Sequence, residues 1–62
     1  MLGKTKLKKL FHEMQDIKGN TVESLTANVY HYLTDNYGDA YTKDHAKEIA
    51  LCLYYKYGFL YK

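Results

Sequence analysis

The residues of this sequence that are able to do chemistry are few, and they stand apart from one another. Ser24 is the single serine, Cys52 is the single cysteine, and the histidines are His12, His31 and His45. Nucleophilic catalysis needs a serine or cysteine held against a histidine that an acidic group orients, and no pairing here indicates such a triad. Cys52 stands between two leucines, which predicts a buried, inert thiol. We therefore predict that the protein is not an enzyme.

Metal and cofactor sites are equally hard to find in the sequence. His12 and Asp16 lie four residues apart, but a pair with this spacing on a helix is more often a surface contact than a set of metal ligands. No Cys and His residues stand at the spacing of a zinc site, and no glycine-rich phosphate loop is present. We expect neither a metal nor a cofactor.

A short cluster of lysines near the start of the chain is the main charged feature. It consists of Lys4, Lys6, Lys8 and Lys9, in a chain whose nine lysines and seven acids give a formal net charge of +2. Such a cluster suits electrostatic steering toward an acidic partner or contact with nucleic-acid phosphates. A solvated helix end is the more common role of a basic run this short. The sequence has no arginine, the residue that most often reads guanine.

Apolar residues recur at three- and four-residue intervals in three stretches, and this spacing predicts three amphipathic helices. The stripes are Leu7, Leu10, Phe11, Met14 and Ile17; Val22, Leu25, Val29 and Leu33; and Ala46, Ile49, Ala50, Leu53 and Tyr57. The helices are predicted at about 4-18, 22-36 and 43-57. Strand-forming residues near positions 29–33 and the alternation at 49–57 make β-strands the alternative there.

Glycine and threonine residues punctuate these stretches. Gly19, Gly38 and Gly58 each follow an apolar stripe, and glycine ends helices readily because it enters the left-handed region without a side-chain clash. Thr21 and Thr42 stand where a hydroxyl can cap the second and third helices. The sequence therefore predicts an all-α three-helix bundle, with the apolar segment after Gly58 packed back onto it as a tail.

The length of 62 residues limits the chain to one domain, residues 1-62. A domain of this size buries only about 60% of the surface that its unfolded chain exposes, so small domains often depend on a disulfide, a metal, oligomerisation or a partner. One cysteine forms no internal disulfide, which leaves a homodimer or a partner. The start of the chain has no signal-peptide pattern, and no apolar stretch approaches the ~20 residues of a membrane span. We expect a cytoplasmic protein.

The third predicted helix carries apolar residues nearly all round. Leu51, Tyr55 and Phe59 fall on the side away from its main stripe, with Tyr61 nearby. One interpretation is that the bundle and the tail cover this side. The other is that these four residues form a protein-binding surface, because contiguous exposed apolar side chains commonly mark interaction sites and aromatic residues are frequent at binding hot spots. The eight tyrosines of the chain favour the second interpretation.

From these features we predict a small, non-enzymatic protein-binding module, a regulator or inhibitor that acts stoichiometrically. The composition, rich in lysine, tyrosine and asparagine, suggests a phage or other mobile element as the source. The alternative is a DNA-binding protein resembling a helix-turn-helix, which uses the lysine-rich first helix and the start of the third, where Thr42, Lys43, Asp44, His45 and Lys47 stand.

Overall fold

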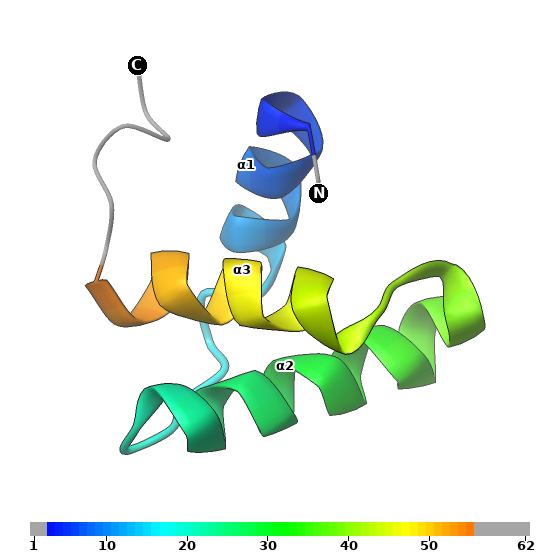
Figure 1. The fold of residues 1–62 in the computed structure, drawn as a ribbon. Helices are drawn as coiled ribbons and strands as arrows, with labels where there is room; N and C mark the ends of the chain where they lie inside the picture. Colours follow the sequence, from blue (N-terminus) through cyan, green and yellow to red (C-terminus); the bar gives the residue numbers. More distant parts are fainter. Residues whose placement is uncertain (1–2, 56–62) are drawn as a thin grey trace.

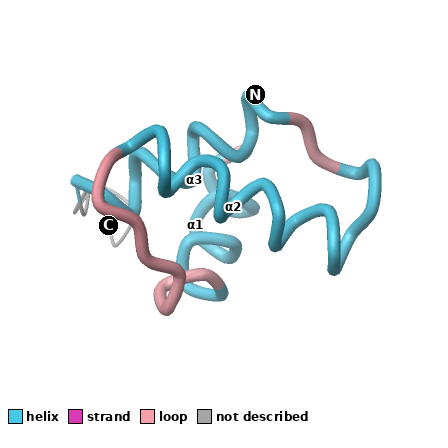
Figure 2. The backbone as a smooth tube through the Cα atoms, turned by 90° about the horizontal axis from the view of Figure 1, so that it is seen from below, coloured by secondary structure: helices cyan, strands magenta, loops and turns pink. Residues whose placement is uncertain are grey.

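The computed structural model describes residues 3–55, and the predicted all-α three-helix bundle is confirmed. The elements are α1 (Lys4–Glu13), α2 (Val22–Tyr37), the short 3-10 helix η1 (Gly38–Ala40) and α3 (Lys43–Tyr55). Helices α2 and α3 run side by side in opposite directions, and α1 lies across them behind α3 (Figure 1). The same three elements are seen from below in Figure 2. The strand alternatives are wrong, because both stretches are helical as far as residue 55.

All three helices contribute to one apolar core. Among residues 3–55 the buried side chains of this core are Leu7, Leu10, Phe11, Met14, Leu25, Val29, Leu33, Ala46, Ile49, Ala50 and Cys52. Ile49 lies at its centre with no exposed surface. The alanines of α3 keep that helix thin where it packs along α2, so the two backbones approach closely. Most positions of the three predicted stripes are therefore in the core.

The first helix is shorter than its apolar stripe. The sequence predicted a helix to residue 18, but α1 ends at Glu13, and the Met14 N–H donates to the Leu10 carbonyl to close the last turn. The Ile17 N–H then donates to the Met14 carbonyl over 3.0 Å in a separate turn. This turn redirects the chain toward α2 while Met14 stays buried and Ile17 stays packed on the core. Tertiary packing thus ends the helix before its periodicity does.

The two glycines that link the helices have different physical roles. Gly38 follows α2 with a φ of 63°, in the region that favours glycine, as predicted. Gly19 does not end a helix. A Cβ at Gly19 would lie 2.7 Å from the Leu25 backbone nitrogen and 2.8 Å from its Cα, so glycine is required for close backbone approach. Gly58 and the tail lie outside the described residues.

Both threonine caps are present. The Thr21 hydroxyl accepts from the Ser24 N–H over 3.0 Å at the start of α2. At the start of α3, the Thr42 hydroxyl accepts from the His45 N–H over 3.3 Å, and the Thr42 N–H donates to His45 Nδ1 over 3.2 Å. The second pair is reciprocal, as in a capping box in which histidine takes the place of glutamate. These caps fix where α2 and α3 begin.

Candidate protein-binding surface

The predicted binding surface lies on the last turns of α3. Tyr55 is 55% exposed and Leu51 is half-buried. Phe59 and Tyr61, the other two predicted members, lie outside the described residues. The structure therefore tests the position of two of the four residues, and it places neither of these two in the core.

Leu51 differs from Leu53, the other half-buried leucine of α3, because its side chain does not pack on the core. Within residues 3–55, the half-buried apolar side chains that pack on the core are Ile17, Tyr30, Tyr32, Tyr41 and Leu53, and Leu51 is not one of them. The apolar surface of Leu51 is therefore not used in the central packing of the bundle. Cys52, which the sequence predicted to be buried, is 3% exposed and belongs to the core.

Tyr54 extends this surface, although it was not among the predicted binding residues. It is 45% exposed, and its ring lies edge-on to that of Tyr55 with centroids 5.0 Å apart. It also borders a hollow formed with the α1–α2 connection and Leu25. Two adjacent aromatic rings, each about half exposed, are the kind of anchor that protein interfaces favour. We call Leu51, Tyr54 and Tyr55 the α3 surface.

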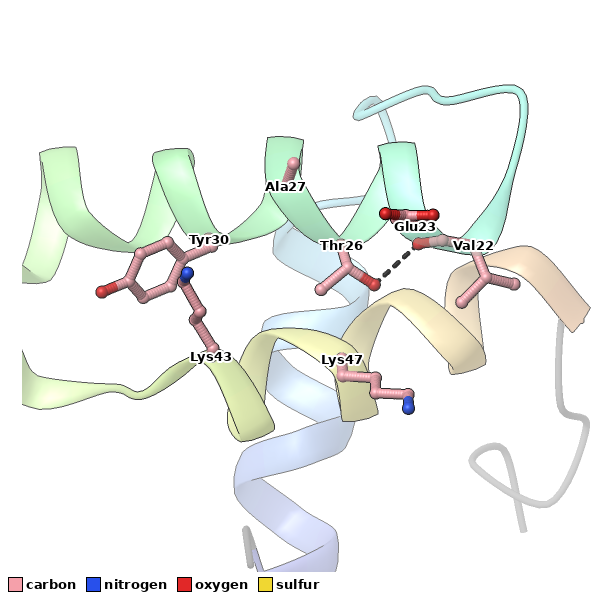
Figure 3. Close-up of a pocket in the computed structure, with 7 residues that line it drawn as sticks. All are labelled: Val22, Glu23, Thr26, Ala27, Tyr30, Lys43 and Lys47. Atoms are coloured by element: carbon pink, nitrogen blue, oxygen red, sulfur yellow. Dashed lines mark hydrogen bonds between the residues drawn. The ribbon is translucent and has the colours of Figure 1, made fainter.

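The groove between α2 and α3 was not predicted. It is lined by Val22, Glu23, Thr26, Ala27, Tyr30, Lys43 and Lys47, and its volume is about 760 Å³. In Figure 3 the Tyr30 ring projects from α2 toward Lys43, and Lys47 extends from α3 one turn further along, with α1 behind both helices. The Lys43 Nζ atom lies 5.8 Å from the centre of the Tyr30 ring. The groove is thus mainly apolar on α2, where Glu23 is the one charged residue of the lining, and positively charged along α3.

The lysine cluster of α1 is on the surface. Lys4, Lys6 and Lys9 are exposed, and Lys8 is half-buried. The Lys6 Nζ atom lies 5.7 Å from the centre of the Tyr41 ring, which brings the lysine-rich end of α1 to the segment just before α3. The two regions that the DNA-binding alternative requires therefore meet on the surface.

A carboxylate with two tyrosine partners joins α1 to α2, and no sequence pattern predicts this cluster. The hydroxyls of Tyr32 and Tyr37 donate to the Glu13 carboxylate at 2.8 and 2.7 Å. The Tyr37 and Tyr32 hydrogen bonds lower the pKa of Glu13. Donation to that carboxylate in turn raises the pKa of Tyr37 to about 12 and also raises the pKa of Tyr32. Tyr32 and Tyr37 follow Glu13 by 19 and 24 positions in the sequence and meet it only in the folded protein, so helical spacing does not predict these contacts.

In the described part of the chain, no three His, Cys, Asp or Glu side chains are grouped so that they could hold a metal ion. Burial raises the pKa of the Cys52 thiol, which keeps it protonated and unreactive. None of the helices between residues 3 and 55 combines the length and apolar character that a bilayer crossing requires.

Comparison with known proteins adds no relative. The chain matches no protein-family model, and no curated protein and no solved structure is significantly similar to it.

Proposed function

We propose that this protein is a non-enzymatic binding module that acts on another protein through the α3 surface. The observation that carries the proposal is the position of Leu51, which is half-buried but off the core, beside two tyrosine rings that are 45% and 55% exposed. Apolar side chains in such a group lose their contact with water when a partner covers them, and this burial drives association. Phe59 and Tyr61 belong to the proposed surface on sequence grounds alone.

The proposed mode of action is stoichiometric regulation or inhibition. A chain of 62 residues without catalytic machinery acts by occupying a surface of its partner, and a phage or mobile-element source fits its size and composition. The exposed lysines of α1 support steering toward an acidic partner, because charges at the rim of an interface mainly raise the association rate. The free thiol of Cys52 supports a reducing, cytoplasmic location. A homodimer through the same α3 surface is the competing arrangement.

Site-specific photocrosslinking in the cells that encode the protein tests this proposal. A photoreactive phenylalanine analogue replaces Tyr55 in one variant and the exposed Ser24 of α2 in the control. We expect a defined crosslinked protein from position 55 and none from position 24. Crosslinks only to a second copy of the chain would establish the homodimer instead, and identical products from both positions would contradict the proposal.

DNA binding is a second proposal, favoured by the contact between Lys6 and Tyr41 that joins the two basic regions. The arrangement of α2 and α3 argues against a helix-turn-helix, since helices in that motif cross steeply and these two lie antiparallel (Figure 1). Fluorescence anisotropy with a labelled DNA duplex distinguishes the proposals. Binding at physiological salt that weakens steeply as salt rises, and that is lost on neutralising Lys4, Lys6, Lys8 and Lys9, would favour DNA.

A further inference from the structure

The α2 wall of the α2/α3 groove is long enough to contact about two turns of a helix. This wall presents Val22, Thr26 and Tyr30, which follow one another at four-residue intervals and are all half-buried. Eight residues of helix span about 12 Å, so the wall is a little more than two turns long. The Thr26 hydroxyl donates to the Val22 carbonyl over 2.7 Å and is satisfied within α2 (Figure 3). The α2 wall therefore offers mainly apolar contact.

The charges around the groove are arranged asymmetrically. Lys43 and Lys47 stand one turn apart on the α3 side, about 6 Å along the helix axis, and both are exposed. Glu23 is the one acidic residue of the lining, and it belongs to α2. Asp44 and Glu48 each follow one of these lysines and are turned about 100° away from it around α3. A bound segment with two carboxylates one turn apart can pair with Lys43 and Lys47. If the segment were turned so that its carboxylates faced α2, Glu23 would repel them.

Leu51 of the α3 surface stands beyond one end of the groove, although it is not among the lining residues. Leu51 follows Lys47 by one helical turn, and because α3 runs antiparallel to α2 it lies at the end of the groove where α2 begins with Val22. Val22, like Leu51, is half-buried without packing on the core of the described residues. Apolar side chains that the core does not use thus stand at one end of the groove, next to the proposed interface.

We propose that the groove binds an acidic amphipathic helix of the partner protein. The apolar stripe of that helix covers Val22, Thr26 and Tyr30, and two of its carboxylates, one turn apart, pair with Lys43 and Lys47. This inference rests on the proposed function, because it names the chemistry of the partner segment that reaches the α3 surface. The recognition mode is that of an amphipathic helix in a groove, read by anchors at helical spacing.

Three fluorescein-labelled peptides test the inference against the full-length protein. They share one leucine stripe and differ at two positions one turn apart, which hold glutamate, glutamine or lysine. Fluorescence anisotropy should give about fivefold tighter binding of the glutamate peptide than of the glutamine peptide, the scale expected for two exposed ion pairs. The lysine peptide should bind more weakly than both. The preference should shrink as salt rises.

Paired variants assign the preference to the groove. Replacing Lys43 and Lys47 by glutamine should abolish the preference for glutamate, whereas replacing both by arginine, which keeps the positive charge, should preserve it. Val22→Glu should weaken binding of the glutamate and glutamine peptides, whereas the matched Ser24→Glu should not. Circular dichroism first confirms wild-type helicity in each variant, which we expect because Val22 and Ser24 lie outside the core.

Several outcomes would overturn the inference. No peptide binding, equal binding of the glutamate and glutamine peptides, or tight binding of unlabelled protein to a labelled second copy would each do so. If Leu51→Asp weakens peptide binding and Val22→Glu does not, the peptide binds to the α3 surface and not to the groove. The inference would then be wrong while the proposed function stands, and crosslinking from position 55 tests that function independently.

Discussion

Gly19→Ala tests the packing of the connection between α1 and α2. The added Cβ would meet backbone atoms of Leu25 at 2.7 and 2.8 Å, and backbone does not rotate away as a flexible side chain does. Overpacking of this kind costs about 1–3 kcal/mol, against a total free energy of unfolding of roughly 3–9 kcal/mol for 62 residues. We expect a loss of about 2 kcal/mol, which corresponds to a fall of about 8–16 °C in Tm for a domain this small.

Thermal and urea unfolding followed by circular dichroism measure this loss. Gly3→Ala is the control for a Cβ added without a clash, because no atom lies within 4 Å of a Cβ at Gly3; since Gly3 is the N-cap of α1, its cost should be about 0.5–1 kcal/mol. Gly38→Ala places alanine at a φ of 63° and a ψ of -127°, a conformation that side-chain-bearing residues rarely adopt, and this strain costs about 1–3 kcal/mol without any clash. If Gly19→Ala were as stable as Gly3→Ala, the close approach to Leu25 would not exist and this account of the connection would be refuted.

Three further predictions concern the tyrosine–carboxylate cluster, a helix cap and the thiol. Because the native pKa of Glu13 is lowered, its contribution to stability is present above the ordinary value of 4.5 and is lost as the pH falls through the native pKa, so Glu13→Gln should reduce the acid dependence of Tm. In a tyrosinate absorbance titration, the same variant should lower the pKa of Tyr37 from about 12 toward its ordinary value of 10. Thr21→Ala removes the bond to the Ser24 N–H and should cost about 1 kcal/mol in urea unfolding. Cys52 should react with a thiol reagent only as fast as the protein opens, and full reaction within seconds in native buffer would contradict its burial.

The fold was predictable from local signals because most of its core follows them. Leu10, Val29 and Ile49 each belong to the apolar stripe of a different helix, and all three are buried. The Thr21 and Thr42 caps stand directly before α2 and α3. The early end of α1 was not predictable, because the stripe continues to Ile17 and only packing against the rest of the fold ends the helix.

The candidate surfaces were predictable only in part. The position of Leu51 and Tyr55 on the outer side of α3 follows from helical spacing. The groove depends on how α2 and α3 pair, since it brings Tyr30 beside Lys43 from two helices. The bonds from Tyr37 and Tyr32 to Glu13 likewise need the crossing of α1, which sequence periodicity does not determine.

Quantitative affinity capture from the encoding cells, with wild-type protein, Leu51→Asp and Ser24→Asp as baits, tests the central claim most directly. We expect Leu51→Asp to keep the helical content of the fold and to capture at least about tenfold less partner than the wild type. An aspartate within an apolar interface removes more than about 1.4 kcal/mol of binding free energy, which corresponds to this factor. Ser24→Asp should capture the partner as the wild type does. Equal capture by all three baits would contradict the claim that the apolar surface of α3 binds a partner.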